Sequence, residues 1–295
     1  MIDYKILKEN GFKPRSIKKR SNSYLLDTLD GRKYVIKKDC DNVSSKLDYL
    51  LSRNFGYFPS FLRVDDYNIF DYVEDFNISD EERFLDMASL TGVLHSKTMR
   101  YKDVDIDDYK IIYEDLEKEI DYLISYYTEL NDLIDREIYM SPSKYLLVCN
   151  ISKIYSALYF CKRELSKWYD LVKDKSKQRV NFIHNNLDLD HLIRNDNLYL
   201  ISWDKSKVDM PIYDLYNLYT KYYKKTSFDI FLSEYQKVYP LSEDELKLFF
   251  IKISIPYKVS FDLDEFSNTS SVRDLLIYIS HSDRLIKSFY KKANN

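Results

Sequence analysis

Two histidines, His184 and His191, lie close in the sequence to the aspartates Asp188, Asp190 and Asp204. Imidazole and carboxylate groups are the side chains that most often transfer protons or hold metal ions. His191 could act as a general base, or it could bind a transition metal together with His184 and Asp190. The segment has no third histidine or cysteine to complete such a metal site, so we do not expect one. The other two carboxylates belong to Asp188 and Asp204.

The elements that must position these side chains alternate in type. Short apolar runs at 182–183 and 198–201 predict β segments on either side of the polar loop. Beyond the loop, four stretches have the apolar spacing of helices. These closing helices are expected over residues 212–223, 228–238, 243–257 and 272–292.

The first 75 residues are β-rich. Apolar runs at 23–28 and 33–38 are joined by Asp30-Gly31, a strong hairpin signal. Residues 44–53 have helical spacing, and two further short strands are expected at 61–64 and 68–73. This region therefore predicts a small antiparallel sheet with one helix.

From Ser79 the spacing becomes helical, beginning with a capping box formed with Glu82. Two long helices are expected over 112–134 and 147–172, separated by a helix start at Ser141-Pro142. Apolar residues in the second helix recur at alternating steps of four and three. We interpret this seam as internal core, and a homodimer through the long helical hairpin is the alternative.

The composition of the chain indicates which kinds of partner and which cell compartment to expect. The 295 residues include 45 Lys or Arg and 48 Asp or Glu, giving a net charge of −3, which does not favour nucleic acid as a partner. The three cysteines show no C-x-x-C spacing, which favours a reduced, cytoplasmic protein. We expect no membrane span, because no apolar run approaches about 18 residues. Only 4 glycines occur, and they form no phosphate-binding cluster.

Five segments carry a family resemblance. Residues 184–193 (HNNLDLDHLI) resemble the H-G-D-L-H-x-x-N-I-L catalytic loop of aminoglycoside phosphotransferases, choline kinases and the bacterial spore-coat kinase-like proteins. Residues 200–204 (LISWD) resemble that family's I-I-D-W/F metal-binding strand, and 211–215 (PIYDL) resemble its P-x-x-D-L helix start. Residues 34–37 (YVIK) resemble the lysine-bearing strand, and 88–96 (ASLTGVLHS) resemble the A-x-x-L-x-x-L-H helix.

The resemblance implies an α+β, bilobal, protein-kinase-like fold. A small β-rich N-lobe would occupy residues 1–75, and a large, mostly helical C-lobe would occupy 76–295 and contain the loop 184–204. An active member would use ATP and Mg²⁺ to phosphorylate a small molecule. A protein partner or a small molecule would bind in the interlobe cleft.

Three positions depart from the family's motif. The catalytic Asp matches Asn186, whose amide cannot accept a proton as a general base. The metal-binding Asn and Asp match His191 and Ser202, which are poor ligands for Mg²⁺. We therefore expect a degenerate catalytic site and a pseudokinase with no bound cofactor. Weak or metal-independent nucleotide binding is the alternative.

Nearby carboxylates leave an alternative open, in which the protein is a divergent phosphotransferase with a relocated metal site. Asp204 lies two residues after Ser202 and would face the same side if the strand continues. The relocated ligands would then be Asp188, Asp190 and Asp204.

On the nucleotide side, Lys37 matches the phosphate-contacting lysine, and Asp48 is its expected acidic partner on the first helix. The glycine-rich loop is matched by Ser21, Asn22 and Ser23, whose side chains obstruct close approach of the backbone to phosphate.

Two further motif residues, His184 and Asp214, have structural roles in the family. Their retention favours a fold kept without its reaction, serving as a binding or scaffold module. Resemblance to the spore-coat branch implies a bacterial protein of the cytoplasm, with a forespore or mother-cell association.

Overall fold

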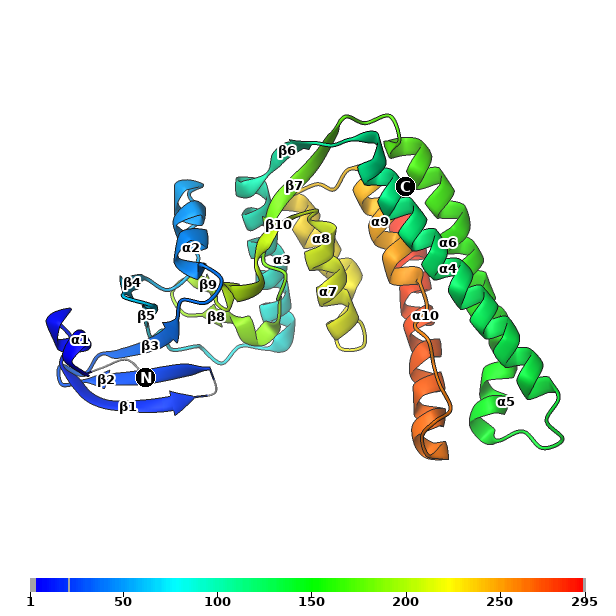
Figure 1. The fold of residues 1–295 in the computed structure, drawn as a ribbon, viewed down its shortest axis with the longest axis horizontal. Coiled ribbons are helices and arrows are strands. Elements are labelled where there is room, and N and C mark those ends of the chain that lie inside the picture. Colours follow the sequence, from blue (N-terminus) through cyan, green and yellow to red (C-terminus); the bar gives the residue numbers. More distant parts are fainter. Residues whose placement is uncertain (1–3, 21, 294–295) are drawn as a thin grey trace. The chain divides into compact units, whose positions relative to one another are not determined.

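The computed structural model describes residues 4–20 and 22–293 (Figure 1). The strands are β1 (Pro14–Arg20), β2 (Ser23–Thr28), β3 (Lys33–Lys38), β4 (Phe61–Val64), β5 (Tyr67–Asp71), β6 (Arg100–Asp103), β7 (Lys177–Ile183), β8 (Leu192–Arg194), β9 (Leu198–Leu200) and β10 (Lys207–Asp209). The helices are α1 (Tyr4–Glu9), α2 (Val43–Ser52), α3 (Asp80–Thr98), α4 (Ile106–Asp135), α5 (Pro142–Val148), α6 (Ile151–Val172), α7 (Ile212–Tyr222), α8 (Phe228–Val238), α9 (Glu243–Ser254) and α10 (Glu265–Ala293).

The chain forms two compact units. The first comprises Met1–Met99, Asn181–Asp209 and Lys237–Tyr239. The second comprises Arg100–Val180, Met210–Gln236 and Pro240–Asn295. The loop at 184–204 thus belongs to the same unit as the N-terminal sheet, while the lobe boundary at residue 75 stays a prediction.

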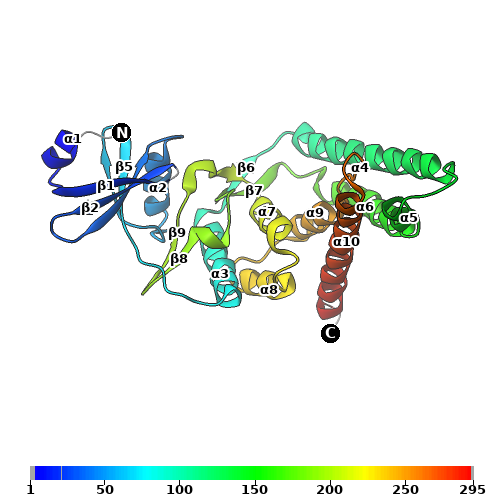
Figure 2. The same ribbon diagram turned by 90° about the horizontal axis from the view of Figure 1, so that it is seen from below.

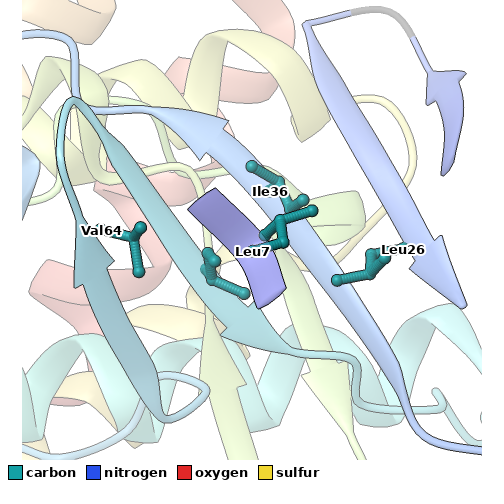
Figure 3. Packing of buried hydrophobic residues seen from close by; sticks show 5 residues of the cluster. Leu7, Leu26, Ile36 and Val64 are labelled. Atoms are coloured by element: carbon teal, nitrogen blue, oxygen red, sulfur yellow. The ribbon is translucent and has the colours of Figure 1, made fainter. Parts of the chain in front are cut away.

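An antiparallel five-stranded sheet, in the order β1-β2-β3-β5-β4, forms the N-terminal part of the first unit. One face of this sheet is apolar and packs against α1, whose Leu7 is fully buried between Leu26 and Ile36 of neighbouring strands (Figure 3). This confirms the predicted sheet. The region contains two helices rather than the one expected, because short α1 covers the sheet.

The linker after β5 is tied to the β8–β9 hairpin within the first unit. The backbone N–H of Phe76 donates to the carbonyl of Arg194 over 2.7 Å, and the N–H of Arg194 donates to Asp75 over 2.8 Å. The N–H of Leu200 donates to the carbonyl of Tyr57 over 2.7 Å. These bonds hold the loop at 184–204 against the sheet.

The second unit is built on the antiparallel pair α4 and α6, which run side by side (Figures 1 and 2). Seven of the eight predicted seam residues are buried, and α6 packs against α4 and α9, so the seam forms internal core. The eighth, Ile151, is half-buried. A homodimer through this helical hairpin stays a prediction. The seam residues with at most 1% exposure are Leu147, Ile154, Leu158, Cys161, Leu165, Trp168 and Val172.

Four helix boundaries differ clearly from the prediction. Helix α4 begins at Ile106 rather than at residue 112, after the N-cap Asp105. The helix expected over 147–172 is broken between α5 and α6, where Asn150 leaves the helical conformation. Helix α9 ends at Ser254 because the residue before Pro256 is disfavoured in a helix. Helix α10 begins at Glu265 rather than residue 272, where the carboxylate of Asp264 accepts the backbone N–H of Ser267 over 3.0 Å.

In the part of the chain that the structure describes, no helix combines the length and apolar character needed to cross a membrane.

Candidate functional site

His184 follows β7 directly and braces the loop resembling a catalytic loop. Its side chain is fully buried, and Nε2–H donates to the carbonyl of Ile201 over 3.0 Å. The imidazole packs edge-on against Trp203 at 4.6 Å between ring centroids. The indole N–H of Trp203 donates in turn to the carbonyl of Leu200 over 2.9 Å. His184 therefore connects the two sides of the loop.

The next two residues, Asn185 and Asn186, both carry side-chain amides. Asn185, at the position of the motif's glycine, has a φ of 56°, in the left-handed region that glycine and asparagine tolerate best. Its amide donates to the carbonyl of Lys205 over 3.2 Å. Asn186, half-buried, offers an amide where the motif has a carboxylate.

His191, at the position of the metal-binding asparagine, is turned toward its own loop. Its Nδ1 lies 2.8 Å from the carbonyl oxygen of Asn186, so Nδ1 must carry the proton. The backbone N–H of His191 donates to the carbonyl of Asp188 over 2.9 Å. The imidazole thus supports the conformation of the loop.

Ser202, at the position of the metal-binding aspartate, follows the end of β9 at Leu200. Its φ is 69°, and a 3-10 turn over Trp203–Lys205 comes next. The strand does not continue, so the expectation that Asp204 faces the same side as Ser202 through strand alternation is wrong. Asp204 nevertheless lines a pocket, while its backbone carbonyl accepts Nζ of Lys46 over 2.8 Å.

The other two carboxylates lie away from that pocket lining. Asp188 caps the 3-10 turn over Leu189–His191, with its side chain accepting the backbone N–H of Asp190 over 3.2 Å. Asp190 is exposed. The structure therefore does not bring Asp188, Asp190 and Asp204 together in the pocket lining.

A pocket of about 200 Å³ lies between the sheet and this loop, inside the first unit. Its walls are largely apolar, and its polar groups come from Lys37, Lys38, Asn68, Asp71, Tyr72, Ser202 and Asp204. Its lining residues are Val35, Lys37, Lys38, Val43, Phe58, Pro59, Asn68, Phe70, Asp71, Tyr72, Val73, Ile193, Leu200, Ile201, Ser202, Trp203 and Asp204.

Lys37 of β3 lines the pocket and is half-buried. Asp48 does not pair with it, because α2 buries Val43, Leu47 and Leu50 and leaves Asp48 exposed. Among residues 4–20 and 22–293, no carboxylate forms an ion pair with Lys37. The predicted pairing of Lys37 with Asp48 is therefore absent from the structure.

Sequence reasoning missed a buried polar network beside Lys37. Asp39, whose side chain is 5% exposed, accepts the Ser44 hydroxyl over 2.6 Å, the Ser44 backbone N–H over 3.2 Å and Nδ2 of Asn68 over 2.9 Å. Burial raises the pKa of Asp39, but these hydrogen bonds outweigh it and hold the pKa below its usual range. Asn68 sits opposite Lys37 in the pairing of β3 with β5. The signal in the sequence was Asn68 itself, a polar residue within the apolar strand β5.

The turn matching the glycine-rich loop is described in part. Ser21 lies outside the described residues. Asn22 is exposed, and the hydroxyl of Ser23 donates to the carbonyl of Arg20 over 3.1 Å. In the second unit, Asp214 is fully buried in the first turn of α7.

The residues of the site do not fit Mg²⁺. Magnesium requires oxygen ligands in near-octahedral geometry, usually including carboxylates. Over the described residues, no three His, Cys, Asp or Glu side chains gather in a group that could hold a metal ion. Ser202 and His191 supply a hydroxyl and an imidazole, and Asp204 is the one loop carboxylate in the pocket lining.

The pocket combines apolar walls with a few polar groups. Val35, Phe70 and Ile201 supply apolar walls, and the ammonium group of Lys37 is available for an anion. Next to Lys37, the buried Oδ1 of Asn68 has no hydrogen-bond partner.

The sequence matches no family profile and no curated protein, but solved structures resemble the fold over nearly the whole chain. An aminoglycoside phosphotransferase from Alicyclobacillus acidocaldarius subsp. acidocaldarius superimposes with a TM-score of 0.69, covering 100% of this chain and 97% of that one at 12% identity. The fold is that of the aminoglycoside phosphotransferases. The AMP-bound spectinomycin phosphotransferase gives a TM-score of 0.51, covering 97% of this chain and 93% of that one at 13% identity. At these identities the likeness concerns the fold alone.

Proposed function

We propose that this protein is a pseudokinase: a binding or scaffold module on an aminoglycoside-phosphotransferase-like fold that has lost phosphoryl transfer. The observation that carries the proposal is the identity and geometry of the three motif positions. Asn186, His191 and Ser202 stand where the motif has the base and both metal ligands, and Nδ1 of His191 lies 2.8 Å from the carbonyl oxygen of Asn186.

Phosphoryl transfer depends on positioning and on neutralising charge, so each replacement removes a required group. Asn186 cannot take the proton of an attacking hydroxyl. The Nδ1–H of His191 is directed at the carbonyl of Asn186. Ser202 offers a neutral oxygen where a carboxylate is needed.

The second candidate, a divergent phosphotransferase, is favoured by one observation. Asp204 lies in the pocket lining beside Ser202, where a carboxylate could contact a metal ion. Within the described residues no three His, Cys, Asp or Glu side chains gather in a group that could hold a metal ion, so we place this candidate second.

Thermal-shift titration with ATP separates the two candidates. Each titration is run in Mg²⁺ and in EDTA, and stabilisation by a ligand that binds the folded state follows RT ln(1 + [L]/Kd). We expect any shift to be the same in both buffers. A shift that requires Mg²⁺ would refute the pseudokinase proposal.

Restoring the motif gives a second test. Asn186→Asp alone should produce no ATP turnover, because the two metal positions remain substituted. The triple variant Asn186→Asp, His191→Asn, Ser202→Asp is the comparison, with ADP release as the readout. Turnover in the single variant would mean that metal binding survives, contrary to the proposal.

The resemblance to the spore-coat branch adds a setting to the proposal: a cytoplasmic binding role in a spore-forming bacterium, in the forespore or mother cell, with a protein partner. A fluorescent fusion expressed through sporulation tests this setting. Uniform signal that is independent of sporulation would contradict it.

A further inference from the structure

The outer side of β1 is a free strand edge. β1 is the first strand in the order β1-β2-β3-β5-β4, and it pairs with β2 alone (Figure 1). Among the described residues, no backbone hydrogen bond reaches the other side of β1. Backbone N–H and C=O groups of alternate residues therefore point outward along that side, where another extended chain can pair with them.

Positive charge is concentrated on this strand. Five of the eight residues 13–20 are Lys or Arg and none is Asp or Glu, although the whole chain has a net charge of −3. All five side chains are exposed, and none forms an ion pair within the described part of the chain. The acidic residue of the neighbouring strand, Asp27, instead accepts the hydroxyl of Ser16 over 2.8 Å. The five cations are Lys13, Arg15, Lys18, Lys19 and Arg20.

The cations lie on both faces of the strand. Lys18 pairs with Leu25 of β2 and Lys19 pairs with Tyr24, so their side chains point to opposite faces. A chain that pairs along the free edge therefore meets a cation on either face. Like charges opposite each other on paired strands are destabilising, which disfavours a second copy of β1 as the pairing strand. Opposite charges in the same positions are stabilising.

The charge and the free edge together indicate the kind of partner. The charge alone would attract any polyanion, such as nucleic acid or an anionic membrane surface. The free row of backbone donors and acceptors suits a polypeptide, because an extended backbone has matching groups at the spacing of a strand. β1 also exposes no large apolar side chain that could enter a bilayer. These features favour a protein segment over a membrane or nucleic acid.

We infer that the free edge of β1 is a docking site for an acidic, extended segment of a partner protein, which adds a strand to the sheet. The backbone of this segment pairs with β1, and its Asp or Glu side chains contact the cations on both faces. No residue of β1 lines the pocket, so the docking site is separate from it. The inference holds whether or not the protein transfers phosphate.

The test uses the full-length protein and a fluorescein-labelled peptide of five Glu-Thr repeats, with fluorescence anisotropy as the readout. The peptide is long enough to cover the seven residues of β1, and its threonines favour an extended backbone. The double variant Lys18→Glu, Lys19→Glu should weaken binding about tenfold or more, because attractive cross-strand pairs become repulsive.

Arg100→Glu, Lys102→Glu is the matched control. These two exposed cations lie on β6, which is the edge strand of another sheet, and the change in net charge is the same. The control should bind the Glu-Thr peptide as the wild type does. All titrations are run at physiological ionic strength, where attraction between distant exposed charges is largely screened.

Two further peptides separate strand addition from simple charge attraction. The Glu-Thr peptide methylated on every backbone nitrogen keeps its charge but has no backbone N–H to donate, so it should not bind. A Lys-Thr peptide of the same length should bind Lys18→Glu, Lys19→Glu more tightly than it binds the wild type. Because this reversal requires an intact edge strand, it also shows that the variant is folded.

Equal affinities for the methylated and unmethylated peptides would overturn the inference, as would an equal loss of affinity in the β6 control. Failure of the wild type to bind the Glu-Thr peptide would overturn it as well. Tighter binding to a DNA duplex or to phosphatidylserine vesicles than to the peptide would identify a general polyanion surface instead. None of these results bears on the pseudokinase proposal, which the titration with ATP tests separately.

Discussion

Replacing Asp39 by alanine should destabilise the first unit strongly, although Asp39 belongs to no motif. The change removes three hydrogen bonds to a carboxylate that is 5% exposed. It leaves the hydroxyl of Ser44 and the amide of Asn68 without their acceptor, and these residues are 2% and 1% exposed. An unsatisfied buried polar group costs about 1–3 kcal/mol, so we expect a loss of about 2–5 kcal/mol at pH 7.

The two tryptophans make this loss measurable in one unit. Trp203 lies in the first unit and Trp168 in the second, and both are buried. Urea denaturation followed by fluorescence in a Trp168→Phe background therefore reports the first unit. Asp48→Ala is the control, since Asp48 is exposed on α2 and should change the free energy of unfolding by no more than about 0.5 kcal/mol.

The contribution of Asp39 to the free energy of unfolding should also depend on pH. The pKa of Asp39 is lowered by folding from an unfolded value of about 3.9, so its carboxylate stabilises the folded state above that pH. The contribution is lost as pH falls through the lowered folded pKa. The difference between wild type and Asp39→Ala should be largest at neutral pH and should shrink below about pH 4. A loss under about 1 kcal/mol at pH 7, or a difference independent of pH, would refute the reasoning.

Two further substitutions test the second unit, with Trp168 fluorescence as the readout. Leu158→Ala should cost about 2–5 kcal/mol, because Leu158 is fully buried in the α6 seam and the change leaves a cavity; a loss under 1 kcal/mol would mean that the seam is not core. Glu245→Ala should cost about 3–5 kcal/mol, because it strands the guanidinium of Arg179, whose Nε donates to the nearly buried carboxylate over 2.8 Å. Asp170→Ala, which breaks an exposed ion pair, should change stability by less than about 1 kcal/mol, and an effect equal to that of Glu245→Ala would contradict the burial argument.

The strands at 23–28 and 33–38 could be predicted with their bounds because two local signals agree there. Apolar and aromatic residues favour strands on both sides, and the turn contains Gly31, which adopts a φ of 82°. The start of α3 could be predicted for the same reason, because the side chain of Ser79 accepts the backbone N–H of Glu82, three residues later. Such features depend on neighbours within a few residues, which the sequence displays directly.

β1 could not be found in this way. Its sequence, PRSIKKR, has one large apolar side chain, Ile17, which packs on the core, while its cations are exposed. The strand exists because β2 offers its edge for pairing, which is a tertiary cause. The hydrogen bonds of Asp39 could not be predicted either, because Asn68 is far from Asp39 in the sequence and approaches it only through the pairing of β3 with β5.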